Sequence, residues 1–231
     1  MSVLKIPLLL AVELGTHVSM TAPNPPPAKP DQLPPRGIER VAPRAVPLLM
    51  KACFWAFGLA EVVVLTAQRV PGATRMLHLL DFSSSDGPTR LALTTPFLVG
   101  AALNLAGSAL RIHCYRRLRH FFTFELGVSA SQHLITDGVY SVVRHPSYSG
   151  ALLVGVGVAL CTLTPGAWAV ECTPLGDGSA PAVLWCGAVP LALFGLHTRM
   201  NKEDAMLRER FRDEWDAWVK RVPWRVLPGV Y

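Results

Sequence analysis

The sequence predicts an all-α, polytopic membrane protein with about five transmembrane helices and a C-terminal amphipathic helix at the membrane interface. Of its 231 residues, 51% are hydrophobic and only 16% are charged, whereas soluble domains carry about 25% charged residues. Three stretches without Asp, Glu, Lys or Arg are long enough to cross a bilayer, which takes about 20 apolar helical residues. These stretches are Leu91–Leu110, Ser149–Val170 and Gly178–Thr198.

Two further candidate spans lie in the N-terminal part. Ala45–Ala67 is apolar apart from Glu61 and Lys51, and Lys51 lies near the start of the segment, where a long side chain can snorkel to the interface. Residues 1–20 have the outline of a secretory signal peptide. We favour a retained span, because Glu13 follows the apolar segment too soon for a clean cleavage region.

A proline-rich segment separates these two candidate spans. Residues 22–47 contain nine prolines among 26 residues, so we expect an extended connector and no stable helix. A ligand for an SH3-type domain is the less favoured alternative to a spacer. The chain then divides into an N-terminal transmembrane part, residues 1–110, and a catalytic membrane core with a cytosolic tail, residues 111–231.

The basic residues predict the orientation. Thr164–Thr198 contains no Lys or Arg, so the loop between the last two spans should face the lumen or the exterior. Arginines crowd the loop before these spans, Arg111 included, and Lys and Arg crowd the tail after them, so both segments should be cytosolic. The net charge of +6 therefore reflects topology. We expect membrane lipids with anionic headgroups as partners and no nucleic acid, since no base-stacking aromatic pattern accompanies the basic residues.

The five cysteines predict neither a disulfide framework nor a metal site. They are scattered along the chain, without a Cys-x-x-Cys pair and without a repeated spacing. Structural zinc sites need closely spaced pairs of ligands. Cysteines inside apolar stretches behave as small hydrophobic residues. We therefore expect no metal.

Polar residues collect beside the membrane in the segment 132–150. Pro146 suits the first turn of a helix, so His145 should lie at or near the N-cap and Tyr148 within the first turn. The helix then continues into the membrane. Its free N–H groups and positive dipole end suit a carboxylate or a phosphate at the cytosolic face. An interfacial anchoring belt of His, Tyr and Arg is the alternative.

A second polar segment follows the last span. Arg199 and Glu203 lie four residues apart and share one helical face, either as a binding site or as an exposed ion pair worth a few tenths of a kcal/mol. The helix then continues with an apolar stripe and a charged face, which is typical of a helix lying in the membrane interface. The stripe consists of Leu207, Phe211, Trp215, Trp218 and Val222.

These motifs, in this order, resemble the isoprenylcysteine carboxyl methyltransferase family, part of a wider group of membrane methyltransferases that includes phospholipid methyltransferases. The likeness is sharp over residues 132–231 and only architectural over residues 1–110. Membrane sterol reductases carry sequences similar to Arg-His-Pro-x-Tyr-x-Gly, so the combination of motifs is what makes it specific. The motifs are Gly138-Val139-Tyr140, Arg144-His145-Pro146-Ser147-Tyr148-x-Gly150, Arg199-x-x-x-Glu203-Asp204, Arg221-Val222-Pro223 and Leu227-Pro228-Gly229-Val230.

The resemblance implies methyl transfer from S-adenosylmethionine to the C-terminal carboxylate of a prenylated cysteine in client proteins. It also implies a multi-pass protein of the endoplasmic reticulum membrane whose active site faces the cytosol. By position, Arg199 matches the residue that meets the substrate carboxylate, and Glu203 matches an acidic cofactor contact; we expect both to be catalytic. The other implied cofactor-binding residues are Glu125, Gln132, His133, Leu134, Ile135, Tyr140, His145, Pro146, Ser147 and Tyr148.

Four positions depart from the family pattern. Glu125 stands where a glutamine is usual, which leaves its cofactor role open. Asp204 stands where a second glutamate is usual, a milder change. The pair Gln132-His133 replaces a His-Thr pair, and its backbone contacts should survive more easily than its side-chain contacts.

The implied chemistry suits these residues. A carboxylate is already ionised at pH 7, so its attack on a sulfonium needs no general base. Opposite charges cancel on the way to the transition state, so a shielded site at the membrane boundary should favour the reaction. We expect Arg199 to align the acceptor, the cofactor's own carboxylate to lie near His145–Tyr148, and the prenyl chain to lie between spans.

Three rival functions remain open at this point. A phospholipid N-methyltransferase would use the same cofactor, but its amine substrate must first lose a proton, and Arg199 would repel it. A sterol-type reductase would use NADPH. A non-catalytic membrane scaffold would keep the fold without binding S-adenosylmethionine.

Overall fold

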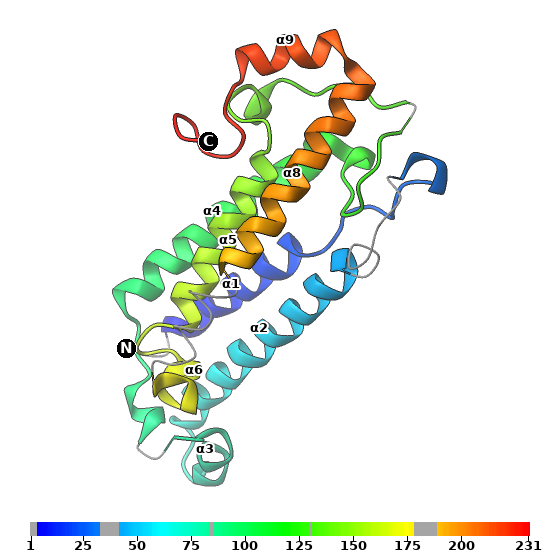
Figure 1. Ribbon diagram of the computed structural model, residues 1–231. Coiled ribbons are helices and arrows are strands. Elements are labelled where there is room, and N and C mark those ends of the chain that lie inside the picture. Colours follow the sequence, from blue (N-terminus) through cyan, green and yellow to red (C-terminus); the bar gives the residue numbers. More distant parts are fainter. Residues whose placement is uncertain (1–3, 33–41, 84–85, 130, 178–188) are drawn as a thin grey trace.

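The computed structural model describes residues 4–32, 42–83, 86–129, 131–177 and 189–231, which form helices joined by turns and one isolated bridge between Gln32 and Gly127. The predicted all-α class is confirmed. The longer helices run along the molecule, with α3 and α6 at one end and α9 at the other (Figure 1). The helices are α1 (Lys5–Ser19), α2 (Ala42–Ala67), α3 (Thr74–Leu80), α4 (Thr95–Leu118), α5 (Pro146–Thr162), α6 (Trp168–Glu171), α8 (Val189–Phe211) and α9 (Asp213–Arg221).

Two helices in the described part of the chain, Arg44–Ala67 and Thr95–Phe121, are long and apolar enough to cross a membrane. The first coincides with the predicted span Ala45–Ala67, and the second overlaps the predicted span Leu91–Leu110 but extends beyond its C-terminal end. Much of the apolar surface of α2 is exposed, as at Leu48 and Leu49, which is how a lipid-facing helix presents itself. Helix α1 has 15 residues and α5 has 17, so both are shorter than the roughly 20 residues of a full crossing. The number of five spans therefore stays a prediction.

The predicted span Ser149–Val170 is too long at its C-terminal end. Helix α5 ends at Thr162, because Pro165 cannot continue a helix and Gly166 has a φ of 88°. The chain then turns into the short helix α6. Of the predicted span Gly178–Thr198, residues 178–188 lie outside the described part, and the remainder forms the first part of α8.

The proline-rich connector is shorter and better packed than the sequence predicts. Helix α2 begins at Ala42, so Pro43 and Pro47 lie inside it; Pro43 falls in the first turn, where its missing N–H is not needed. The side-chain amide of Asn24 donates to the carbonyls of Arg119 and Phe122, at 2.6 and 2.9 Å. The described part of the connector is thus docked on the protein and is no free spacer.

The predicted interfacial helix is wrong in two respects. Helix α8 ends at Phe211. Arg212 has a φ of 45°, which is not helical, so the predicted single helix is interrupted before α9 begins. The apolar stripe is covered by protein, since Trp215 and Trp218 are each only 3% exposed. They pack in one cluster with Cys114 and Tyr140. The stripe therefore docks α9 on the protein core, because α4 and the segment around residue 140 present a matching apolar surface.

Buried charges tie the helices together at the end opposite α9. Lys5 pairs with Glu61 and donates to the carbonyl of Gly166 at 2.8 Å, and Glu61 accepts the backbone N–H of Trp168 at 3.1 Å. An apolar segment can hold charged residues when they are paired and hydrogen-bonded in this way. This network joins α1, α2 and α6, so α1 is an integral part of the fold.

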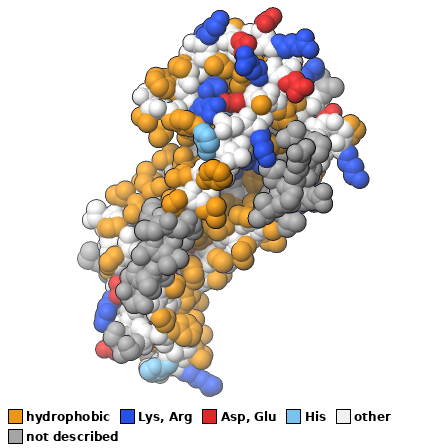
Figure 2. Space-filling view, in the orientation of Figure 1, with side chains coloured by type: hydrophobic (Ala, Val, Ile, Leu, Met, Phe, Trp, Pro, Cys, Tyr) orange, Lys and Arg blue, Asp and Glu red, His pale blue; other side chains and the backbone are white. Residues whose placement is uncertain are grey.

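The two ends of the molecule differ in the chain terminus and the side chains that they carry. The chain begins at the end that holds α6, whereas its C-terminus lies toward α9 (Figure 1). Figure 2 shows hydrophobic side chains over the middle of the visible face and charged side chains gathered most densely at the α9 end. Residues 110 and 111, which divide the predicted N-terminal part from the predicted catalytic core, both lie within α4, so Arg111 belongs to a helix and not to a loop.

Helices α4 and α5 pack with their backbones in direct contact. A Cβ added at Gly157 would lie 2.6 Å from the backbone nitrogen of Asn104 and 2.6 Å from the carbonyl oxygen of Gly100. Glycine at such positions lets membrane helices approach closely. The contact holds the C-terminal half of α5 against the N-terminal half of α4.

Replacing Gly157 with alanine should lower the thermal unfolding midpoint in detergent by several degrees. The added methyl meets backbone atoms, which cannot move as a flexible side chain does, and such overpacking costs about 1–3 kcal/mol. Gly155→Ala is the matched control, because a Cβ at Gly155 meets nothing within 4 Å. Equal midpoints for the two variants would contradict the close packing of α4 and α5.

Candidate active site

A cavity of about 850 Å³ lies among α4, α5, α8 and the segment that joins α4 to α5. Its size falls within the range of small-molecule sites, about 300–1,000 Å³. The structure brings all twelve predicted site residues to its wall, although what each does there stays a prediction. They are Glu125, Gln132, His133, Leu134, Ile135, Tyr140, His145, Pro146, Ser147, Tyr148, Arg199 and Glu203.

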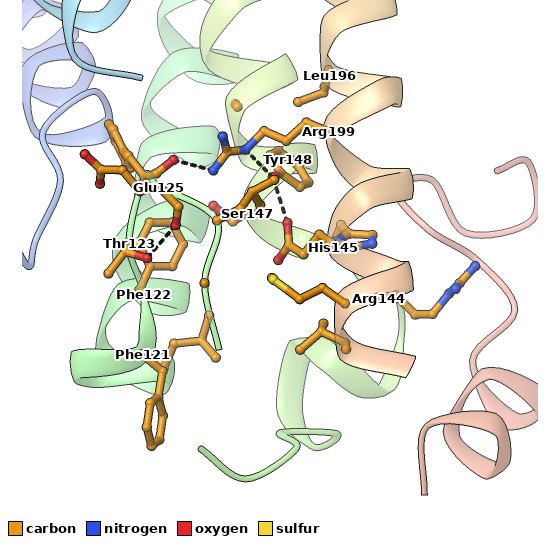
Figure 3. Close-up of a pocket in the computed structure, with 18 of the residues that line it drawn as sticks. Phe121, Phe122, Thr123, Glu125, Arg144, His145, Ser147, Tyr148, Leu196 and Arg199 are labelled. Atoms are coloured by element: carbon orange, nitrogen blue, oxygen red, sulfur yellow. Dashed lines mark hydrogen bonds between the residues drawn. The ribbon is translucent and has the colours of Figure 1, made fainter. Parts of the chain in front are cut away.

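Arg199 and Glu203 meet through Tyr148, which reaches them from α5 (Figure 3). The guanidinium Nε of Arg199 donates to the Tyr148 hydroxyl at 2.9 Å, and that hydroxyl donates to Glu203 Oε2 at 2.8 Å. Arg199 also donates through Nη2 to the carbonyl of Phe124. The interpretation as a merely exposed ion pair on one helix is therefore wrong. The guanidinium is held on two sides inside the cavity.

The start of α5 forms as the sequence predicts. His145 is the N-cap and Pro146 the first helical residue. His145 and Ser147 are buried, and the backbone N–H of His145 donates to the carbonyl of Arg225 at 2.8 Å. The C-terminal tail thus anchors the first turn of α5 beside the cavity.

Asp204 lies behind the cavity wall, and its carboxylate contacts three basic side chains. Its carboxylate lies 2.7 Å from His145 Nε2, 3.0 Å from Arg144 Nη1 and 3.1 Å from Arg225 Nη2. Burial by itself raises the pKa of Asp204, but the hydrogen bond and charge of His145, followed by the charges of the two arginines, outweigh it and lower that pKa below its ordinary value. Asp204 therefore joins α8, the start of α5 and the C-terminal tail.

Two predicted cofactor residues have surroundings that the sequence does not reveal. Glu125 accepts a hydrogen bond from Arg44 Nε at 3.0 Å, so the residue that replaces the usual glutamine is paired with a cation from the start of α2. His133 is exposed, and its ring packs edge-on against Phe121 with ring centroids 5.4 Å apart. Neither contact requires a ligand.

Two more predicted residues support the wall from behind. Leu134 and Ile135 pack against the apolar cluster that holds Tyr140 and Trp218. Burial raises the pKa of Tyr140 far above its ordinary value, so its hydroxyl stays protonated and can donate a hydrogen bond. The strip 132–135 is therefore fixed to the protein core on one side and lines the cavity on the other.

Sequence reasoning missed one buried cation of the cavity wall. Arg111, in α4, is 8% exposed. Its Nη1 donates to the carbonyl and to the hydroxyl of Ser147, at 3.0 and 3.1 Å. In the sequence, Arg111 is one of several clustered basic residues that together indicate topology, so it does not stand out. The available signal was that it directly follows the charge-free stretch Leu91–Leu110 and continues the same helix.

The residues present fit S-adenosylmethionine. The cavity offers carboxylates for cationic and hydroxyl groups, buried guanidinium groups for a carboxylate, and aromatic and aliphatic walls for a nucleoside base. Glu203 supplies a negative charge, and Arg111 supplies a positive charge. Among the residues that the structure describes, no group of three His, Cys, Asp or Glu side chains could hold a metal ion; that the protein uses no metal stays a prediction.

Comparison with known proteins gives two kinds of relative. Residues 95–175 match the phospholipid methyltransferase family. Protein-S-isoprenylcysteine O-methyltransferase B of Arabidopsis thaliana is 27% identical over 126 residues, which cover 54% of this chain and 55% of that protein. A probable protein-S-isoprenylcysteine O-methyltransferase of Oryza sativa is 29% identical over 126 residues, covering 54% of this chain and 57% of that protein. The resemblance to the isoprenylcysteine and phospholipid methyltransferase group is thereby confirmed.

The second kind of relative is a reductase. The Delta(14)-sterol reductase of Methylotuvimicrobium alcaliphilum is 27% identical over 141 residues, which cover 56% of this chain and 29% of that protein. The chain thus spans about half the length of the methyltransferases and under a third of the length of this reductase. No solved structure matches the chain.

Proposed function

From its resemblance to the isoprenylcysteine and phospholipid methyltransferase group, we propose that this protein transfers a methyl group from S-adenosylmethionine to the C-terminal carboxylate of a prenylated cysteine in client proteins. The observation that carries the proposal is the guanidinium of Arg199, which Tyr148 and the carbonyl of Phe124 hold inside the cavity. A guanidinium in a fixed position can bind both oxygens of a carboxylate and so orient it.

The same guanidinium favours a carboxylate over an amine as methyl acceptor. An acceptor carboxylate is ionised at neutral pH and needs no base. A phospholipid amine is protonated at that pH, so it would have to lose a proton beside a cation that repels it. Opposite charges attract and then cancel in carboxylate methylation, and a cavity with apolar walls at the membrane boundary favours such a loss of charge.

The protein's own residues orient the reactants. S-adenosylmethionine, when bound, supplies a methyl group on a positively charged sulfur. Glu203 is the acidic contact for the cofactor, and Tyr148 fixes both this carboxylate and Arg199. One hydroxyl thereby sets the distance between the acidic contact and the acceptor-binding guanidinium. Such alignment is the main contribution that a protein can make to a transfer that needs no proton transfer.

The apolar edge of the cavity suits a prenyl chain. Val46 and Pro47 from the first turns of α2, and Phe194 and Leu196 from α8, all line it. Val46 and Phe194 are also strongly exposed, as expected for side chains that contact lipid tails. We place this site in the endoplasmic reticulum membrane with its opening toward the cytosol, in line with the basic residues at the α9 end.

Methyl transfer from labelled S-adenosylmethionine to N-acetyl-farnesylcysteine tests the proposal, with phosphatidylethanolamine as the competing acceptor. We expect a labelled methyl ester that alkali hydrolyses, and no labelled phospholipid. The matched control is N-acetyl-farnesylcysteine methyl ester, whose carboxylate is blocked and which should accept no methyl group. Label in the phospholipid alone would contradict the proposal.

A sterol reductase is the second candidate, because two of the relatives described above are similar to this chain to the same degree and one of them reduces sterols by name. Such an enzyme would bind NADPH and consume it in the presence of a Δ14-unsaturated sterol. We expect no consumption of NADPH. Binding of NADPH together with failure to bind S-adenosylmethionine would replace the methyltransferase proposal with this one.

A further inference from the structure

Arg111 carries a buried positive charge at the wall of the cavity. Its Nε donates to the carbonyl of Ser19 at 2.9 Å and to the hydroxyl of Tyr115 at 3.1 Å, and its Nη1 donates to the carbonyl and hydroxyl of Ser147. The guanidinium also lies 5.9 Å from the centroid of the Phe124 ring. Four hydrogen bonds and two aromatic rings, the second that of Tyr115 at 5.4 Å, fix its position, and all of these groups are neutral.

This neutral surrounding is unusual for a buried cation. In the described part of the chain, no carboxylate lies within ion-pair distance of Arg111, whereas buried Lys5 and partly buried Arg144 are each paired with one. Neutral hydrogen bonds satisfy the donors of a guanidinium, but they do not compensate its charge, and an uncompensated buried charge is costly. Arg111 lines the wall of the cavity, so an anion bound there could compensate its charge.

A glycine in α5 leaves room for the side chain of Arg111. A Cβ at Gly150 would lie 2.8 Å from Arg111 Cγ, so any larger residue there would displace the arginine. Gly150 is the last residue of the Arg-His-Pro-x-Tyr-x-Gly motif. The aliphatic part of Arg111 crosses α5 at this glycine, and its charged end reaches the first turn of the helix at Ser147. The positive end of the helix dipole adds to the charge of Arg111 there.

We propose that Arg111 binds the carboxylate of the amino-acid portion of S-adenosylmethionine, an inference that rests on the proposed function. The reaction brings two carboxylates into one cavity, one on the acceptor and one on the methyl donor. Four arginines line the cavity, but Arg44 is paired with Glu125 and Arg144 with Asp204. The other two contact the same residue at different groups: Arg199 contacts the carbonyl of Phe124, and Arg111 contacts its ring. Arg199 then serves the acceptor and Arg111 serves the donor. Because each carboxylate has its own guanidinium, the acceptor carboxylate and the donor carboxylate bind at different positions.

Calorimetric binding of two donors to the full-length protein in detergent tests this assignment. S-adenosylmethionine and its decarboxylated form, S-adenosyl-3-methylthiopropylamine, differ only in the carboxylate. The wild type should bind S-adenosylmethionine more tightly by roughly 10- to 100-fold, the range for a charge-assisted pair. In Arg111→Gln, which keeps a donor for Ser147 but loses the charge, this preference should fall below about threefold. In Arg111→Lys, which keeps the charge, most of the preference should remain.

The control variant is Arg116→Gln, which removes an exposed arginine from the same helix and should keep the full preference. An unchanged preference in Arg111→Gln would overturn the assignment, as would equal affinity of the wild type for both donors. Loss of both donors in the Gln and Lys variants alike would also overturn it, because Arg111 would then serve folding alone. A wild type that binds neither donor would instead contradict the proposed function itself.

Discussion

Replacing Arg199 with alanine is expected to lower methyl transfer to N-acetyl-farnesylcysteine by roughly 100- to 1,000-fold, while the affinity for S-adenosylmethionine stays within a few-fold of the wild type. In the proposed function the guanidinium anchors the acceptor, and a misplaced acceptor would lose the alignment that gives most of the rate. Glu203 keeps its hydrogen bond from Tyr148 in this variant, so the donor side of the cavity is preserved. Turnover with labelled cofactor and calorimetry of cofactor binding measure the two quantities.

Two further variants make this result specific. Arg199→Lys should recover less than about a tenth of the activity, because a lysine cannot contact Tyr148 and the carbonyl of Phe124 while presenting two parallel donors to a carboxylate. Arg208→Ala removes an exposed arginine from the same helix, where it pairs with Asp216, and should leave turnover unchanged. Full activity in Arg199→Ala would exclude this residue from the site.

Replacing Asp204 with alanine is expected to have the largest effect on stability, about 3–5 kcal/mol. The substitution leaves Arg144, Arg225 and His145 without the buried carboxylate on which they converge, and removing one partner of a buried ion pair costs about this much. A protein of this size loses roughly 2–4 °C of its unfolding midpoint per kcal/mol, so thermal unfolding in detergent should show a shift of about 6–20 °C.

The pH dependence of stability separates this network from ordinary surface pairs. The folded state holds the pKa of Asp204 below its ordinary value, so the stabilisation is complete above the pKa of the unfolded chain, about 3.9, and is lost as the pH falls further toward the folded value. The wild type should therefore lose stability steeply below about pH 4, and Asp204→Asn should lose it less steeply. Asp216→Asn, at an exposed pair with Arg208, is the control and should keep the wild-type slope. Parallel slopes for Asp204→Asn and the wild type would contradict the role of Asp204.

The sequence predicts the helices with strong local signals. Ala45–Ala67 and Leu91–Leu110 are apolar over lengths that only a buried or lipid-facing helix tolerates. The first lies within α2, and all but the first four residues of the second lie within α4, which continues to Leu118. Pro146 predicts the start of α5 to the residue, because a proline is accommodated in the first turn of a helix and disfavoured further in. The limits of elements without such a signal, as at the end of α5, were less well predicted.

The sequence also identifies the residues of the cavity better than it identifies their contacts. The order of the motifs places twelve residues, and all of them line one cavity. The links among them join distant segments: Tyr148 to Glu203, His145 to Asp204, and Arg111 to Ser147. No periodicity or spacing encodes such pairs, because they depend on how α4, α5 and α8 pack against one another.

By itself the amino-acid sequence determined the helical membrane class, the two longest apolar helices, the start of α5 and the identity of the residues around the cavity. Only the tertiary structure decided that the stripe of α9 faces protein and not lipid, that Asp204 joins three elements, and that Arg111 reaches the cavity. The physical reason is that hydrophobicity and proline act locally along the chain. Charge compensation and coverage of an apolar face depend on neighbours that folding brings together from distant segments.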